Sequence, residues 1–200
     1  MPVFRRPGRG SPPDGGARAR WLAVAGVTDE RAIRRLFFAL WPSPVVRAGI
    51  VERRQCIGGL SKRMVPDHNL HLTLLFLGDQ PSDRLDEIVS AAEGAESAGF
   101  EVVLDHLGWF ARARVAWLGG SPPDAGRRLV AELSTRMAAL GLKFDDRPWA
   151  PHVTLFRQVR QRPEFPRVEP LAWPVDRFEL IESVPGRPYQ SLATFALDGS

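Results

Sequence analysis

The sequence predicts a mixed α+β fold, and the order of its apolar segments is the reason. Segments rich in β-branched and large apolar residues alternate with segments whose apolar residues recur every three or four positions, the spacing of a helix face. Two expected strands, 100–106 and 114–118, follow one another directly, as in a hairpin. Adjacent strands of this kind favour an α+β arrangement over a regularly alternating parallel α/β sheet.

The individual elements follow from local signals. RLFFAL at 35–40 is a short apolar run, and Pro44 suits the first turn of the helix after it. HLTLLFLG at 71–78 has the composition of a buried strand, and PPD at 122–124 introduces a helix that stops near Gly141. The full expectation is strands at 35–40, 71–78, 100–106, 114–118, 152–159, 178–184 and 191–197, with helices at 44–57, 83–97 and 124–140.

We expect one folded domain at 34–200, preceded by a disordered extension at 1–33 that is rich in Arg, Gly and Pro. The start of the extension has too few apolar residues to offset the entropy of ordering. WLAVAGV at 21–27 is open to interpretation, as a short strand or as sequence ahead of the fold. With 200 residues and 44% hydrophobic content, the chain can bury a substantial core without disulfides or metals.

The positive charge is concentrated at the start of the chain. Up to Arg35 the sequence has eight arginines and three acidic residues, whereas the rest of the chain is nearly neutral, although the whole carries a formal charge of +4. A neutral body argues against coating long RNA, which needs many phosphate contacts. It allows a pocket for a single nucleic-acid terminus.

Cysteine content and hydropathy indicate the compartment. The single cysteine, Cys56, cannot form an internal disulfide, which fits a reducing, cytoplasmic setting. No apolar run approaches the roughly 20 residues needed to span a bilayer, so no membrane association is expected. The sequence also contains neither a phosphate-binding P-loop nor a convincing dinucleotide motif, and we expect no cofactor and a monomeric protein.

A short motif that occurs twice in the sequence indicates the chemistry. His71-Leu-Thr73-Leu and His152-Val-Thr154-Leu both lie in apolar strand candidates. Residues two apart on a strand face the same side, so each strand presents an imidazole beside a hydroxyl. Taken alone, a histidine on an apolar strand is more often a core residue with satisfied nitrogens than a catalyst; two matching motifs among only four histidines favour a shared site.

Two such strands side by side would bring two proton-exchanging groups and two hydroxyl donors to one cleft. Near neutral pH one imidazole can accept a proton while the other donates one, because the ordinary histidine pKa is roughly 6.5. That is sufficient for phosphodiester chemistry without metal. His68 and His106 lack this context, and a metal site from Asp67, His68 and His71 is disfavoured because an offset of three puts two residues on opposite strand faces.

With these motifs the chain resembles the two-histidine (2H) phosphoesterase superfamily, and within it the RNA 2′,3′-cyclic phosphodiesterases, also called 2′-5′ RNA ligase-like proteins. The resemblance extends from about Arg35 to Leu197. It rests on RLFFALWP at 35–42, NLHLTLLFLG at 69–78, PHVTLFR at 151–157 and ESVPGRPYQSLATFAL at 182–197. It implies two similar lobes of antiparallel sheet with outer helices around a central cleft.

The resemblance also implies roles for the motif residues. His152 would be the proton acceptor that activates water against a 2′,3′-cyclic phosphate at an RNA end, and His71 the proton donor to the departing 3′ oxygen, leaving a 2′-phosphomonoester. Thr73 and Thr154 would bind the non-bridging phosphate oxygens.

Three further residues have open roles. Arg157 lies five positions after His152, so on a regular strand it faces away from the motif; it can contact phosphate only if the strand bends or ends. The resemblance places Phe38 and Trp41 near the strand that forms the entrance of the cleft, where an aromatic face could stack on the terminal base; core packing is the alternative for Phe38. Tyr189, the only tyrosine, has no expected step and is assigned to packing.

Three competing functions remain from the sequence. The same histidines could join RNA ends through a 2′-5′ linkage by the reverse reaction, although abundant water favours hydrolysis. A non-catalytic RNA- or nucleotide-binding module is disfavoured by the presence of both histidines and both threonines. A 2H enzyme acting on another cyclic phosphate is the third.

Overall fold

The structure, a computed structural model, describes residues 32–198. The strands are β1 (Ile33–Leu40), β2 (Arg63–Met64), β3 (Leu72–Pro81), β4 (Phe100–Leu104), β5 (His106–Phe110), β6 (Val115–Gly119), β7 (His152–Arg157), β8 (Leu171–Val175), β9 (Arg177–Glu182) and β10 (Gln190–Ala196). The helices are α1 (Pro44–Gln55), α2 (Leu85–Glu93) and α3 (Asp124–Ala139), with 3-10 turns at Asp67–Asn69 and Ser82–Arg84.

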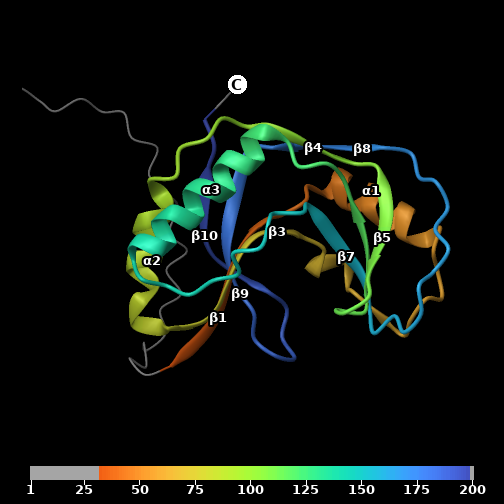
Figure 1. The fold of residues 1–200 in the computed structure, drawn as a ribbon, viewed down its shortest axis with the longest axis horizontal. Helices are drawn as coiled ribbons and strands as arrows, with labels where there is room; N and C mark the ends of the chain where they lie inside the picture. Colours follow the sequence, from red (N-terminus) through yellow and green to blue (C-terminus); the bar gives the residue numbers. More distant parts are fainter. Residues whose placement is uncertain (1–31, 199–200) are drawn as a thin grey trace, which may run out of the picture.

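The large sheet has the order β10-β9-β1-β3-β7-β6-β5, with β2 also pairing to β7, and each of these pairings is antiparallel. Strands β3 and β7 are registered through a single residue pair, Leu72 with Val153. We therefore divide the sheet into a first lobe (β10, β9, β1 and β3) and a second lobe (β7, β6, β5 and β2), which Figure 1 shows side by side. Strands β4 and β8 form a separate two-stranded sheet.

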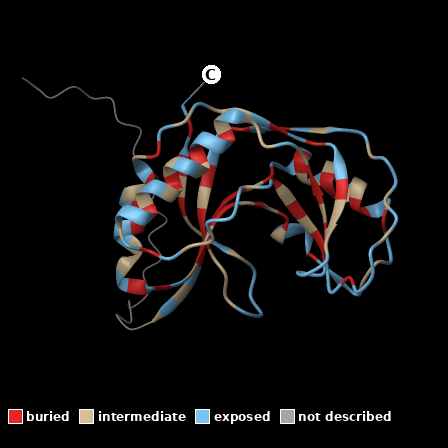
Figure 2. Cartoon of the chain, in the orientation of Figure 1, coloured by how far each residue is buried: buried red, intermediate tan, exposed pale blue. Residues whose placement is uncertain are grey.

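Each lobe is covered by a helix that comes from the other part of the chain. Helix α3 follows β6 of the second lobe but packs on β3 of the first, together with α2, which contacts β10. Helix α1 follows β1 of the first lobe but contacts β6 and β8. The helices therefore tie the lobes together, and Figure 2 shows buried residues along the strands of both lobes.

The two central strands carry the same irregularity. Ala39 and Phe38 of β1 pair with Thr73 and Leu75, so Leu74 is an extra residue in β3. Trp117 and Ala116 of β6 pair with Thr154 and Phe156, so Leu155 is an extra residue in β7. A bulge of this kind reverses the alternation of side chains along the strand beyond it. Both copies of the repeated His-x-Thr motif are therefore followed by a bulge, one residue after the threonine.

The predicted α+β fold, with two antiparallel lobes and outer helices, is confirmed by this architecture. Several boundaries were wrong. The strand expected at 100–106 breaks at Asp105, because β4 pairs with β8 whereas β5 pairs with β6. The strand expected at 152–159 ends at Arg157, where the next residue, Gln158, has a φ of 59°. Strand β8 was not predicted.

The predicted start of the folded domain, at residue 34, lies near the first described residue. Strand β1 already includes Ile33, the last residue assigned to the extension. The rest of the predicted disordered extension, up to Arg31, lies outside the described residues. Within residues 32–198 there is no helix long and apolar enough to cross a membrane.

Candidate active site

The two His-x-Thr motifs meet at the junction of the lobes. The pair that joins β3 to β7 is Leu72 with Val153, the central residue of each motif. Because this pairing is antiparallel, its direction puts His71 next to Thr154 and Thr73 next to His152. The sequence predicted that the motifs share a face, and the register of these two strands brings them together.

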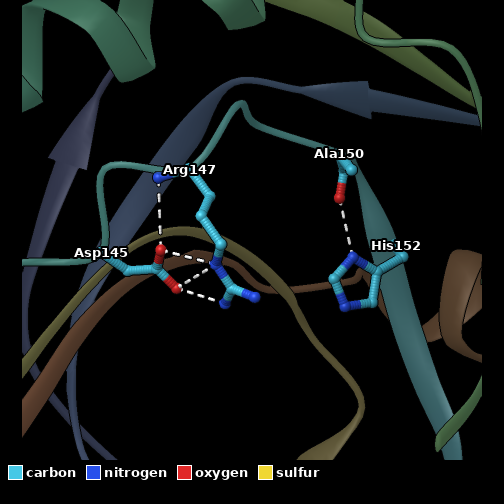
Figure 3. A network of polar contacts seen from close by, with 4 residues as sticks. All are labelled: Asp145, Arg147, Ala150 and His152. Atoms are coloured by element: carbon cyan, nitrogen blue, oxygen red, sulfur yellow. Dashed lines mark hydrogen bonds and ion pairs between the residues drawn. The ribbon is translucent and has the colours of Figure 1, made fainter. Parts of the chain in front are cut away.

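Each imidazole is held by an equivalent hydrogen bond to the backbone carbonyl two residues before it. Nδ1 of His71 lies 2.7 Å from the carbonyl oxygen of Asn69, and Nδ1 of His152 lies 2.7 Å from the carbonyl oxygen of Ala150. The second contact is drawn in Figure 3. A carbonyl oxygen only accepts, so Nδ1 carries the hydrogen in both rings and Nε2 is the nitrogen available for proton transfer.

His71 is surrounded by aromatic rings. The ring of Trp41 stacks on it at 5.6 Å and 8°, Tyr189 meets it edge-on at 5.1 Å, and Phe37 lies 5.0 Å away. The pKa of His71 is lowered from 6.5 to about 4, first by burial; the hydrogen bond to Asn69 opposes this, and the charge of Arg157 adds to it. The free protein therefore holds His71 neutral at pH 7.

His152 has a more open setting. Phe110 meets the ring edge-on at 5.0 Å, and Trp117 lies 6.0 Å away. Burial again lowers the pKa of His152, opposed by the hydrogen bond to Ala150 and reinforced by the charge of Arg147. A lowered pKa keeps this imidazole neutral near pH 7, as a proton acceptor requires.

A cavity of about 990 Å³ lies beside the motifs. Thr73, His152, Thr154 and Arg157 all line it, together with aromatic and charged residues from the β5–β6 turn and from the segment between α3 and β7. His71 is not among the lining residues; its ring is packed among Phe37, Trp41 and Tyr189. The cavity therefore opens directly onto the predicted proton acceptor and both hydroxyls.

Arg157 faces the cavity because of the bulge at Leu155. On a regular strand its offset from His152 would turn it away, but the extra residue restores it to the side of His152 and Thr154. Its charge is one of the causes that lower the pKa of His71, which places it near the first motif as well. Of the two orientations left open by the sequence, the structure has the one directed at the site.

One predicted site residue requires correction. Phe38 cannot stack on a base, because its side chain is completely buried and packs edge-on against Phe178 and Phe195 on the opposite face of the sheet. Its neighbour Phe37 is the one that points toward His71. Trp41 covers His71 with one face, so a base could stack only on its other face.

Sequence reasoning missed three contributors. Tyr189 was assigned to general packing, yet its ring contacts that of His71. Trp149 donates from Nε1 to the carbonyl oxygen of Thr73 at 3.0 Å and so links the segment before β7 to the first motif. Arg147 lines the cavity. The sequence signal for Trp149 and Arg147 was their closeness to the second motif, since they lie three and five residues before His152.

The remaining histidines lie outside the cleft. His68 is exposed in the turn Asp67–Asn69, and His106 contacts Asp105 at 2.6 Å and the ring of Trp117. Asp67, considered with His68 as a metal ligand, accepts a hydrogen bond of 2.6 Å from Arg54. Among residues 32–198 no three His, Cys, Asp or Glu side chains are grouped closely enough to hold a metal ion.

Two lobes that each contribute a His-x-Thr strand to one cleft define the class of two-histidine phosphoesterases. Comparison with known proteins agrees with this geometry. The model of the 2′-5′ RNA ligase superfamily matches residues 41–187. The chain therefore belongs to the 2′-5′ RNA ligase superfamily.

Individual relatives are similar over most of their length. An RNA 2′,3′-cyclic phosphodiesterase of Thermus thermophilus is 31% identical over 183 residues, which cover 82% of this chain and 91% of that protein. The RNA 2′,3′-cyclic phosphodiesterase of Escherichia coli is 33% identical over 135 residues, covering 66% and 77%. The structure of E. coli LigT complexed with 3′-AMP matches with a TM-score of 0.76 and 31% identity, covering 83% of this chain and 99% of that one.

Proposed function

We propose that this protein hydrolyses 2′,3′-cyclic phosphates at RNA ends to 2′-phosphomonoesters, with His152 as proton acceptor and His71 as proton donor. One observation carries the proposal: two imidazoles with identically anchored Nδ1 atoms lie on adjacent strands, beside two threonines and one arginine. The names of the relatives from T. thermophilus and E. coli support the same reaction.

The proposed reaction is a single displacement at phosphorus. Nε2 of His152 removes a proton from water, and the water oxygen attacks phosphorus as the bond to O3′ breaks. Nε2 of His71 donates its proton to O3′. His152 then releases a proton to solvent, and His71 is left neutral, as in the free protein, until the next substrate binds.

Thr73, Thr154 and Arg157 are proposed to hold the non-bridging oxygens. Two hydroxyls and a guanidinium directed at one phosphate stabilise the negative charge that grows on these oxygens as water attacks. Both threonines line the cavity, and the bulge at Leu155 directs Arg157 toward it, which supports a phosphate site that needs little reorganisation. Trp41 is proposed to stack on a base only through the face turned away from His71.

The proton donor must be charged before it can act. His71 has a pKa of about 4 in the free protein, mainly because of burial. An anionic phosphate in the cleft favours the imidazolium and raises that pKa. The proposed sequence of events is therefore substrate binding with proton uptake by His71, followed by proton donation to O3′.

We further propose that the enzyme acts as a cytoplasmic monomer. Cys56 is exposed and free, which suits a reducing compartment. The proposed substrate is an RNA terminus, and the nearly neutral body of the chain suits the recognition of an end better than the coating of a long strand.

The test uses an RNA oligonucleotide that ends in a 2′,3′-cyclic phosphate, with EDTA present, and identifies the product by phosphorus NMR. We expect a 2′-phosphate from the parent and from His106→Ala, a matched control outside the cleft. His71→Ala and His152→Ala should each lose at least about 100-fold in kcat.

Other outcomes identify the competing functions. A 3′-phosphate product would contradict the assigned direction of opening. Persistent turnover in either motif variant would exclude its histidine as an essential acid or base. Tight binding of the oligonucleotide without turnover by the parent would indicate a binding module, and turnover of small cyclic nucleotides alone would indicate a different substrate.

A further inference from the structure

The cavity is larger than the reacting phosphate requires. Its volume of about 990 Å³ lies at the upper end of the range of roughly 300–1,000 Å³ for small-molecule sites. The motif residues and Arg157 line only part of it. Two further arginines, Arg112 on the β5–β6 turn and Arg147 on the segment before β7, also line the wall.

Arg147 is held by a neighbouring carboxylate in a defined orientation. Its Nε donates to Oδ1 and Oδ2 of Asp145 at 2.7 and 3.0 Å, and its Nη2 also donates to Oδ2. These contacts leave Nη1 directed away from the carboxylate. Figure 3 shows the guanidinium between Asp145 and His152, with one nitrogen on the side of the imidazole.

The backbone around Arg147 is fixed to both lobes. The amide of Asp145 donates to the carbonyl oxygen of Phe76 at 3.0 Å, and Nε1 of Trp149 donates to that of Thr73 at 3.0 Å. The carbonyl oxygen of Ala150 holds His152. A donor between three such anchors is preorganised, so binding an anion costs little ordering entropy.

The cavity wall as a whole carries one more positive than negative charge, and Arg147 is one of its accessible arginines. Three arginines and two aspartates line the cavity: Arg112, Arg147, Arg157, Asp145 and Asp146. Asp145 is already paired with Arg147, and Arg157 is assigned to the reacting phosphate. The side chain of Arg147 is nevertheless 82% exposed, so a ligand phosphate can reach it without first breaking a buried contact.

We propose that Arg147, oriented by Asp145, binds the phosphodiester that precedes the terminal nucleotide, and so selects RNA ends over mononucleotides. This inference rests on the proposed function, because it assumes that the terminal cyclic phosphate lies between the two motifs. The RNA chain then passes along the cavity wall from Thr154 toward Arg147. Asp145 is a positioning residue that does not contact RNA.

The test compares three substrates that share one reacting group: adenosine 2′,3′-cyclic phosphate, the dinucleotide ApA with a 2′,3′-cyclic phosphate, and the same dinucleotide with an uncharged methylphosphonate linkage. The variants are Arg147→Ala, Arg147→Lys and Arg177→Ala. Arg177 is a matched control, because it is an exposed arginine paired with a neighbouring aspartate, Asp176, and does not line the cavity.

For the charged dinucleotide, Arg147→Ala should lower kcat/KM by about tenfold more than for the mononucleotide, the size expected for one charge-assisted hydrogen bond. The slope of log kcat/KM against log salt should also fall by about 0.7, as expected for one lost contact to single-stranded RNA. Arg147→Lys should lose less of the kcat/KM for the charged dinucleotide. Arg177→Ala should leave the ratio of kcat/KM between the dinucleotide and the mononucleotide unchanged. The methylphosphonate should remove the effect of Arg147→Ala.

Equal losses on all three substrates would overturn the proposal, because they would assign Arg147 to the reacting phosphate or to His152. A loss that persists with the methylphosphonate would overturn it as well. Binding of a fluorescein-labelled ApA with a 2′-phosphate end is measured in parallel. If the parent turns over no substrate but Arg147→Ala still weakens this binding about tenfold, the proposed function fails while the assignment of Arg147 stands.

Discussion

Filling the cleft with a phosphate anion should change the protonation state of His71. In the free protein this imidazole has a pKa of about 4, because it is buried among Phe37, Trp41 and Tyr189 and lies near the charge of Arg157. At pH 7 only about one molecule in a thousand then carries a proton on His71. A histidine that is neutral in nearly all molecules has no proton to donate when most substrate molecules arrive.

The expected size of the change follows from Coulomb's law. A single negative charge about 4 Å from the imidazolium, at an effective dielectric constant of about 20, stabilises the charged form by about 4 kcal/mol. One pKa unit corresponds to about 1.4 kcal/mol, so the pKa of His71 should rise by about three units, to about 7. An opposite charge favours the protonated form, so binding between pH 4 and 7 should be accompanied by proton uptake.

The measurement is an NMR titration of the histidine ring resonances, with His71→Gln used to assign the signal of His71. The titration is run on the free protein, with saturating adenosine 2′-phosphate, and with adenosine as a control that lacks the anion. The phosphate ligand should raise the pKa of His71 to about 7, and adenosine should leave it near 4. A value that stays below about 5 with the phosphate bound would refute the donor role of His71 at neutral pH.

Two further predictions concern Arg157 and Phe38. Arg157→Ala should lower kcat for the cyclic phosphate by about 100- to 1,000-fold, the cost of losing one preorganised donor to a developing charge. Arg160 is an exposed arginine beyond the end of β7, so Arg160→Ala should retain parent activity. Steady-state kinetics measure both variants, and comparable activity of the two would contradict the orientation that the bulge gives to Arg157. Phe38→Ala should lower the free energy of unfolding by about 3–5 kcal/mol in urea titrations, because it empties a buried core position. Unchanged stability together with an altered preference among adenosine, guanosine and cytidine 2′,3′-cyclic phosphates would instead show that Phe38 contacts the base.

The proposed acid–base pair could be predicted from the sequence because the His-x-Thr pattern depends only on short-range periodicity. A strand presents every second residue on one face, so each His-x-Thr triplet has to display an imidazole and a hydroxyl together. The apolar runs and helix signals were sufficient for the α+β class. Residue identity alone also gave two groups able to exchange protons at neutral pH.

The tertiary structure decided how these groups meet and what surrounds them. Thr154 lies beside His71 only because β3 and β7 pair antiparallel through Leu72 and Val153, and this register is set by contacts between residues more than 80 positions apart in the chain. The orientation of Arg157 depends on the extra residue Leu155, which is defined relative to the partner strand β6. Neither is a property of a local segment.

The same distinction explains the error at Phe38 and the omission of Tyr189. Adjacent aromatic residues in β1 point to opposite faces, and the sequence does not say which face is the cleft; the pairing of β1 with β3 assigns Phe37 to it and Phe38 to the core. Tyr189 reaches His71 from a segment more than 100 residues away. The sequence by itself determined the two His-x-Thr motifs, and the pairing of distant strands decided their neighbours, because burial and register depend on which surfaces meet.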